Sequence, residues 1–281
     1  MDLAEQYLTK IVETAINEDL GLAGDITSQA IMPDDRPGSA VIIAKQNGVV
    51  AGLFAAEAVF KRIDPSLFYE DAVTDGAVVE PGQIVARVDG NLLSILTGER
   101  VALNFLGHLS GIATLTSRYV TKASAYGVDV KDTRKTLPGL RPLEKYAVLV
   151  GGGKNHRFGL YDAVLIKENH IKTAGGVTEA IDLIRKNLEG DLAIEIETET
   201  LEQVKEAIEA GADTIMLDNM DAEMIAEAVK AIDGQATVEV SGGVNLDNIE
   251  DIAKAGPDFI SVGGITQSAP AFDFSLLTTR R

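Results

Sequence analysis

Polar side chains stand at the ends of short apolar runs, and this repeated placement is the clearest chemical signal in the sequence. Four runs end in this way, at Lys167, Glu197, Asp218 and Ser241. A further run is followed directly by Thr133, Arg134 and Lys135. If these runs are parallel strands of a β/α barrel, their carboxyl ends open on one face, which is where such barrels carry their active sites. We therefore expect these side chains to share one site.

Alternation along the strands predicts which acidic side chains point into that site. Successive side chains of a strand face opposite sides, so Glu195 and Glu197 lie opposite to the isoleucines of LAIEIE (192–197). The same alternation turns four more residues inward: Met216, Asp218, Glu239 and Ser241. An unpaired buried charge costs roughly several kcal/mol, so these acids need inward cations such as Lys167, a metal or a substrate as partners. A structural ion-pair network is the alternative. Glu197 and Asp218 together suit Mg²⁺, which binds carboxylates along with phosphate oxygens.

A basic stretch supplies cations for the same site. Residues 131–172 hold nine Lys or Arg and four Asp or Glu, a balance of +5 in a chain whose formal net charge is −18. Arg134 and Arg157 can each grip a carboxylate or phosphate through a bidentate fork. His156 and His170 can donate hydrogen bonds or move protons. A solvated basic face is the simpler interpretation of a charge run, but the glycines and apolar pieces within this one favour a site for a small polyanion.

The last two apolar runs each end in a glycine pair. The two segments are Ser241-Gly242-Gly243 and Val262-Gly263-Gly264. Glycine lets backbone N–H groups come close to an anion, and the start of a following helix adds its positive end. A single pair of this kind is more often a turn. Two pairs at matching positions favour a phosphate site, which barrels commonly carry at this point.

Composition excludes several classes of protein. The chain has no cysteine, which removes disulfides, thiolate metal sites and a cysteine nucleophile, and its three histidines are too widely spaced to favour a zinc site. The negative net charge disfavours nucleic-acid or anionic-membrane partners. Apolar runs are shorter than the ~18 residues of a membrane helix, and the start of the chain lacks a signal-peptide pattern. We expect a cytoplasmic enzyme or binding protein.

The elements that must position these residues change in character along the chain. The second half alternates short strands with amphipathic helices, which indicates parallel βα units. Its clear strands are 128–132, 162–167, 192–197, 214–218, 236–241 and 258–262. A complete barrel has about eight strands, so the prediction is an incomplete barrel, with a doubly wound open sheet as the alternative. In the first half we expect a helix (1–20), a hairpin turning at Asn47-Gly48 (38–53), strands (75–90) and one or two helices (92–126).

Several long blocks of the chain carry a family resemblance. The most specific block is DTRKTLPGLRPLEKYAVLVGGGKNHRFGLYDAVLIKENHI (132–171). Further blocks are ERVALNFLGHLSGIATLT (99–116), EIETETLEQVKEAIEAGADTIMLDN (195–219) and VSGGV (240–244). Together with GDIT and GVVAG in the first half, they resemble the quinolinate phosphoribosyltransferases, also called nicotinate-nucleotide pyrophosphorylases. Gly107-His108 and Leu149-Val150 depart from the residues expected there, outside the expected contacts.

This resemblance implies a fold and an activity. The expected fold is α/β, an incomplete β/α barrel with an N-terminal α/β sandwich: residues 1–107 form the sandwich, 108–270 the barrel and 271–281 a C-terminal tail. The expected enzyme is a decarboxylating glycosyltransferase of pyridine nucleotide (NAD) biosynthesis. It transfers phosphoribosyl from phosphoribosyl pyrophosphate to quinolinate and yields nicotinate mononucleotide, pyrophosphate and carbon dioxide. Mg²⁺ is the expected cofactor, and a homodimer or larger homo-oligomer with shared active sites is the expected assembly.

The resemblance also implies roles for single residues. Those expected to hold quinolinate are Arg100, Arg134, His156, Arg157 and Lys167, with Thr133 beside them. Arg100 is expected to come from the neighbouring subunit. Those expected to be catalytic are Lys135, Glu197 and Asp218, and the two acids are also expected to attend the ribose hydroxyls and Mg²⁺. The backbone expected to hold the 5′-phosphate is that of Ser241, Gly242, Gly243, Val262, Gly263 and Gly264.

Two other functions remain open from the sequence. A Schiff-base aldolase would use Lys167 as a nucleophile on a barrel strand, and borohydride trapping with a keto acid would reveal it. A binding or transport-linked protein would take up its ligand without forming a product.

Overall fold

The computed structural model describes residues 3–32, 36–188, 190 and 192–279. The chain divides into two compact units. The first unit is drawn from Met1–Leu115, Pro138–Gly151 and Ala269–Arg281, and the second from Thr116–Leu137 and Gly152–Ser268. Residues 271–281, expected as a tail, contain a strand of the first unit, while residues 280 and 281 lie outside the described residues.

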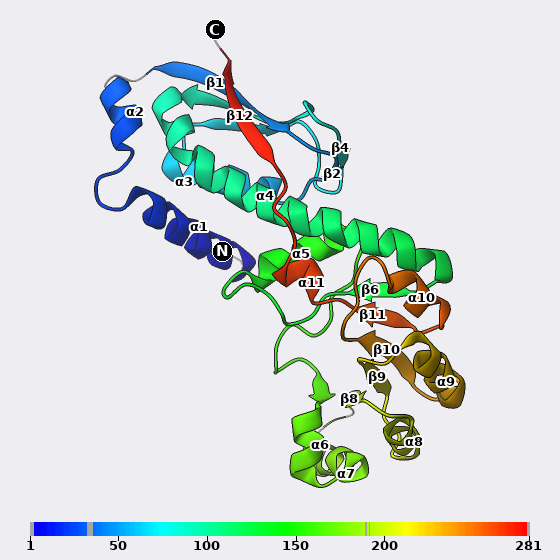
Figure 1. The fold of residues 1–281 in the computed structure, drawn as a ribbon. Coiled ribbons are helices and arrows are strands. Elements are labelled where there is room, and N and C mark those ends of the chain that lie inside the picture. The colour runs from blue at the N-terminus through cyan, green and yellow to red at the C-terminus, as the bar shows by residue number, and fades with distance from the viewer. Residues whose placement is uncertain (1–2, 33–35, 189, 191, 280–281) are drawn as a thin grey trace. The chain divides into compact units, whose positions relative to one another are not determined.

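The first unit is built on an antiparallel sheet with the strand order β12-β1-β5-β3. These strands are β12 (Phe274–Thr279), β1 (Pro37–Ala44), β5 (Ile84–Asn91) and β3 (Phe68–Asp71). Figure 1 shows β12, in red, lying beside β1, in blue. The hairpin expected over 38–53 is wrong. β1 pairs with β12 and β5, and β2 (Gly48–Val49) pairs with β4 (Val78–Val79) instead.

The first unit also contains helices. They are α1 (Leu3–Leu20), α2 (Ile26–Ile31), α3 (Leu53–Ile63), α5 (Arg141–Val150) and the first part of α4 (Leu92–Ala123). One core cluster joins Ile16 of α1, Phe60 of α3, Ile42 of β1 and Leu106 of α4. The segment 92–126, expected as one or two helices, is the single helix α4 followed by a 3-10 turn (Ser124–Tyr126).

The second unit contains a parallel sheet in the order β6-β11-β10-β9-β8-β7. Its strands are β6 (Asp129–Lys131), β7 (Val164–Ile166), β8 (Ile194–Thr198), β9 (Thr214–Asp218), β10 (Thr237–Ser241) and β11 (Phe259–Ser261). Every strand predicted in this half of the chain is present. The order runs from β7 to β11 without the reversal of a doubly wound sheet, and β6 and β7 form its two ends. The prediction of an incomplete barrel is therefore confirmed.

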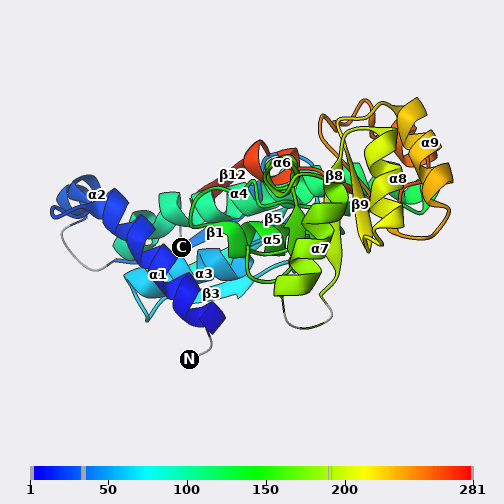
Figure 2. The same ribbon diagram turned by 90° about the horizontal axis from the view of Figure 1, so that it is seen from below.

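Helices connect or follow these strands. They are α6 (Glu168–Ala174), α7 (Val177–Asn187), α8 (Leu201–Glu209), α9 (Ala222–Ile232), α10 (Ile249–Lys254) and α11 (Gly264–Gln267). Two of them start at side-chain caps: Thr200 accepts a hydrogen bond from the Gln203 N–H, and Asp221 accepts one from the Met224 N–H. Helices α8 and α9 lie side by side (Figure 2). In the part of the chain that the structure describes, we find no helix with the length and apolarity to cross a membrane.

Candidate active site

A cavity of about 490 Å³ opens among the carboxyl ends of the parallel strands. Its lining is Thr133, Arg134, Lys135, His156, Arg157, Leu165, Lys167, Glu197, Met216, Asp218, Glu239 and Ser241. Nine of these are residues to which the sequence assigned a role, Met216 and Glu239 were predicted only to point inward, and Leu165 was not singled out. Strand alternation explains the grouping, because β8, β9 and β10 turn every second side chain into the cavity. Polar residues that are far apart in the sequence thus share one hollow.

One glycine of each segment packs closely against another part of the chain. A side chain at Gly242 would strike Asn219, whose backbone nitrogen would lie 2.9 Å from the added Cβ. Gly242 also has a φ of +86°, which favours glycine. A Cβ on Gly263 would lie 2.8 Å from Lys135 Cδ. Gly243, Val262 and Gly264 adjoin these two glycines in sequence. Arg100 lies on α4 in the first unit and is exposed.

An acidic pair stands beside a lysine in the cavity. Lys167 Nζ lies 3.3 Å from Glu197 Oε2. Burial and the charge of Glu197 raise the pKa of the neighbouring Asp218, although a 2.7 Å hydrogen bond from Asn219 Nδ2 opposes this. A cation between the two carboxylates would relieve their repulsion. The donor set therefore fits a divalent ion such as Mg²⁺, which accepts carboxylate oxygens and retains room for phosphate oxygens.

The guanidinium of Arg157 is held by a short loop. Arg157 Nη1 donates a hydrogen bond to the Ala163 carbonyl at 3.1 Å. Asp162 fixes the intervening turn by accepting hydrogen bonds from the N–H groups of Phe158 and Gly159. Burial and the charge of Arg134 lower the pKa of Arg157. A guanidinium whose charge is destabilised by burial and by a neighbouring guanidinium favours an anionic ligand.

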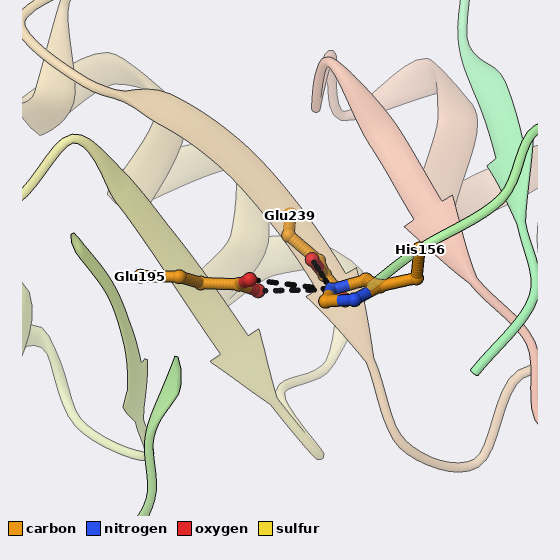
Figure 3. Close-up of side chains that lie close together, drawn as sticks. All are labelled: His156, Glu195 and Glu239. Carbon is orange, nitrogen blue, oxygen red and sulfur yellow. Dashed lines mark hydrogen bonds and ion pairs between the residues drawn. The ribbon is translucent and has the colours of Figure 1, made fainter. Parts of the chain in front are cut away.

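Two buried acids meet one ring nitrogen of His156, as Figure 3 shows. His156 Nε2 lies 3.1 Å from Glu239 Oε2 and 3.2 Å from Glu195 Oε2. Glu239 has 0% of its surface exposed. The three side chains have the composition of a metal-binding group. However, Lys131 already supplies charge close to the two acids, and its Nζ lies 3.2 Å from the centre of the Phe259 ring.

The other polar atoms of His156 also have protein partners. Its ring Nδ1 accepts a hydrogen bond from the backbone N–H of Arg157 at 2.7 Å. The backbone N–H of His156 donates a hydrogen bond to Asp132 at 2.9 Å. Burial lowers the pKa of His156, and the hydrogen bonds and charges of Glu195 and Glu239 raise it. A second ring proton would have to lie on Nδ1 and would break the hydrogen bond from the Arg157 N–H, so this contact favours the neutral ring. Burial, with the hydrogen bond and charge of Glu195, raises the pKa of Glu239 to about 7, so a further proton of the cluster binds to this acid.

Sequence reasoning turned Glu195 and Glu239 inward and expected inward cations, a metal or a substrate as their partners, but it did not identify His156. Their contact with His156 joins positions 39 and 83 residues apart, respectively, so no local pattern could reveal it. His170, which the sequence left open as a donor or proton carrier, has a structural contact instead. Its Nδ1 accepts a hydrogen bond from the Lys167 N–H at 2.9 Å, at the start of α6.

Comparison with known proteins covers nearly the whole chain. Residues 25–110 match the family model described as quinolinate phosphoribosyl transferase, N-terminal domain, and residues 112–277 match the corresponding C-terminal domain. A Synechocystis protein named probable nicotinate-nucleotide pyrophosphorylase (carboxylating) is 47% identical, over 94% of this chain and 90% of its own length. An Arabidopsis thaliana protein named nicotinate-nucleotide pyrophosphorylase (carboxylating), chloroplastic, is 43% identical, over 96% of this chain and 82% of its own.

A solved structure agrees with these relatives. The nicotinate-nucleotide pyrophosphorylase of Francisella tularensis superimposes with a TM-score of 0.93 at 40% identity, over 98% of this chain and 96% of that one. The N-terminal match spans strands β1 to β5, and the C-terminal match spans all six parallel strands and the start of β12. This chain belongs to the quinolinate phosphoribosyl transferase family.

Proposed function

We propose that this chain transfers the phosphoribosyl group of phosphoribosyl pyrophosphate to quinolinate, with loss of carbon dioxide, in NAD biosynthesis. Membership of the family supports the reaction. The observation that carries the proposal is the cavity, which combines Arg134, Arg157 and Lys167 with the acids Glu197 and Asp218. Quinolinate is a dicarboxylate and the donor is a polyphosphate with sugar hydroxyls, so the two substrates together need this mixture of charges.

The cationic side chains are assigned to quinolinate. Arg134 and Arg157 offer bidentate forks, and Lys167 offers a point charge. Thr133 lies beside them, since all four side chains line the cavity. Holding both carboxylates orients the ring, so that its nitrogen can approach the anomeric carbon of the donor. His156 belongs to the same end of the site by family resemblance.

The acids and glycines are assigned to phosphoribosyl pyrophosphate, the donor of the phosphoribosyl group. Glu197 and Asp218 would hold Mg²⁺ and attend the ribose hydroxyls, and Mg²⁺ when bound supplies positive charge to the pyrophosphate. The backbone of two segments is assigned to the 5′-phosphate: Ser241, Gly242 and Gly243, and Val262, Gly263 and Gly264. Gly263 fits this role because it packs closely against Lys135, leaving backbone rather than a side chain at the cavity edge.

The chemistry then follows from charge. The pyridine nitrogen bonds to the anomeric carbon as pyrophosphate leaves, and Lys135 stabilises the charge that develops on the leaving oxygens. The carboxylates of Glu197 and Asp218 favour the positive character of the anomeric carbon. The ring nitrogen is now cationic and stabilises the electron pair that remains on the ring when carbon dioxide departs.

The aldolase alternative fits the cavity less well. A Schiff-base lysine must lose its proton to act as a nucleophile. Lys167 is half exposed and lies 3.3 Å from the carboxylate of Glu197. Its setting is open and ion-paired, unlike the apolar pocket or neighbouring cation that activates such a nucleophile. The pairing therefore favours a binding role for Lys167.

The direct test is incubation of the protein with quinolinate, phosphoribosyl pyrophosphate and Mg²⁺, followed by mass spectrometry. We expect nicotinate mononucleotide and carbon dioxide. Nicotinate has one carboxylate fewer and should be a poor substrate in a parallel assay, because part of the cationic lining would remain unpaired. Ligand uptake without product would favour the binding-protein alternative, and equal turnover of both acids would contradict the assignment of quinolinate.

We also propose a homodimer or larger homo-oligomer in which Arg100 serves the site of a neighbouring subunit. The support is that Arg100 is exposed on α4, in the unit that does not contain the cavity. The cytoplasmic location expected from the sequence stays a prediction, and the Arabidopsis relative is named chloroplastic.

A further inference from the structure

We propose that Glu195 and Glu239 are positioning residues that fix the ring of His156, and that this ring in turn fixes the backbone of Arg157 for carboxylate binding. The proposal rests on the proposed function, in which Arg157 binds a carboxylate of quinolinate. It also changes the role expected for His156, because both ring nitrogens make their hydrogen bonds within the protein and not with the ligand.

The first step is an inventory of the His156 ring. A histidine ring has two nitrogens for hydrogen bonding. Nε2 lies 3.1 Å from Glu239 Oε2 and 3.2 Å from Glu195 Oε2. Nδ1 accepts the Arg157 N–H at 2.7 Å. Both nitrogens are thus engaged within the protein, although the ring lines the cavity.

The second step concerns the proton on that ring. Because Nδ1 accepts a hydrogen bond from an N–H group, it carries no proton, and the ring proton is on Nε2. The two acids face Nε2 and accept this proton. The partner of one ring nitrogen sets the state of the other, so the acids select the tautomer in which Nδ1 can hold Arg157.

The third step follows the contacts to the guanidinium. The N–H of His156 donates to Asp132, a fully buried acid, so the backbone of residue 156 is anchored as well. Arg157 is then held at its N–H by His156 Nδ1 and at Nη1 by the Ala163 carbonyl. The chain of contacts runs from β8 and β10 through His156 to the backbone N–H of Arg157. Glu239 lines the cavity but has no exposed surface, and its Oε2 contacts the His156 ring.

The charge around the acids permits this arrangement. Lys131 interacts electrostatically with Glu239 and Glu195 and stacks on the ring of Phe259. It offsets part of the negative charge beneath the cavity. Arg157 and Arg134 therefore keep their capacity for an anionic ligand, and the acids are left to orient His156.

The test compares two neutral replacements of nearly equal length, measured in the whole enzyme. Glu239→Gln keeps an oxygen that accepts the Nε2 proton, whereas Glu239→Met fills the volume without an acceptor. We expect the KM for quinolinate to rise about tenfold or more in Glu239→Met and to stay within about threefold of wild type in Glu239→Gln. The KM for phosphoribosyl pyrophosphate should change little in either variant, and kcat should change less than the KM for quinolinate.

A spectroscopic measurement on the wild type needs no variant to fold. Nitrogen-15 NMR of histidine-labelled protein reports the protonation of each ring nitrogen, and the chain has three histidines to assign. We expect His156 to carry its proton on Nε2 and none on Nδ1, both with and without quinolinate.

Three results would overturn the proposal. They are an unchanged quinolinate KM in a folded Glu239→Met, an equal rise in both variants, and a His156 Nδ1 that is protonated or changes its protonation when quinolinate binds. If Glu239→Met does not fold, the wild-type spectrum and the KM of Glu239→Gln decide. A wild-type protein that makes no nicotinate mononucleotide would contradict the proposed function. An active wild type with the wrong variant pattern would contradict the positioning role alone.

Discussion

Lys167 Nζ lies 3.3 Å from Glu197 Oε2, so a cation that we assign to quinolinate touches an acid that we assign to the donor. Loss of the lysine should therefore affect both substrates. We expect Lys167→Met to raise the KM values for quinolinate and for phosphoribosyl pyrophosphate by about tenfold each, as measured in steady-state kinetics. Lys172→Met is the matched control, because Lys172 pairs with Glu168 outside the cavity. A rise in the KM for quinolinate alone would show that this contact does not link the binding of the two substrates.

Asp218→Asn should separate the two substrates. The change removes a charge beside Glu197 and so weakens the proposed Mg²⁺ site. We expect use of phosphoribosyl pyrophosphate to fall about tenfold or more and to require more Mg²⁺, while calorimetry shows nearly unchanged binding of quinolinate alone. Asp182→Asn, at an exposed position on α7, should behave as wild type. Identical magnesium titrations for Asp218→Asn and wild type would contradict the assignment.

Arg157→Lys tests the fork rather than the charge. Lysine keeps the positive charge but cannot make two parallel hydrogen bonds to a carboxylate. We expect quinolinate binding to weaken by about 1–3 kcal/mol, measured by calorimetry. Arg87→Lys, at an exposed position on β5, is the control and should have no effect. Wild-type affinity in Arg157→Lys would show that charge alone matters at this position.

Stability should depend on pH through Glu239. Its pKa is raised to about 7, above the value of about 4.3 for an unperturbed glutamate. The folded state therefore binds more protons than the unfolded state between these values. The stabilisation is fully present below about pH 4.3 and is lost as the pH rises through about 7. The melting temperature of the wild type should fall across this window more steeply than that of Glu239→Gln, and parallel curves would contradict the prediction.

The shared-site proposal yields a mixing test. Arg100→Ala and Arg134→Ala should each be nearly inactive as homo-oligomers. If Arg100 serves a neighbouring subunit, a hybrid dimer has one site with both arginines intact and another with both defects. Refolding the two variants together should then restore part of the activity.

The control for this test is native mass spectrometry of the same mixture, which shows whether hybrids have formed. If Arg100 serves its own chain, every hybrid site keeps one defect and activity stays at background. Background activity in a mixture that contains hybrids would therefore exclude the cross-subunit role.

The parallel sheet could be predicted because its signals are local. Each strand is a short apolar run, and alternation alone turned Glu197, Asp218 and Ser241 toward one cavity. The antiparallel sheet could not be predicted in the same way. The partner of β1 on one side is β12, from the other end of the described chain. Asn47-Gly48 suggested a hairpin, but pairing between distant strands overrode this local turn signal.

The limits at the site have the same cause. The residue types in the cavity predicted a polyanionic ligand, and strand alternation predicted that these residues share one site. The contact of His156 with Glu195 and Glu239 depends on how a loop returns over two strands, and the sequence has no periodic signal for that path.

The position of β12 has a consequence for biosynthesis of the chain. Phe272, Phe274 and Leu276 belong to the same apolar core as Ile16 and Phe60. Translation delivers the first residues long before residues 269–279 leave the ribosome. Until then β1 lacks its neighbour on one side, and the unpaired edge can bind other strands. The first unit can therefore complete its sheet and core only after the residues of the second unit have been synthesised.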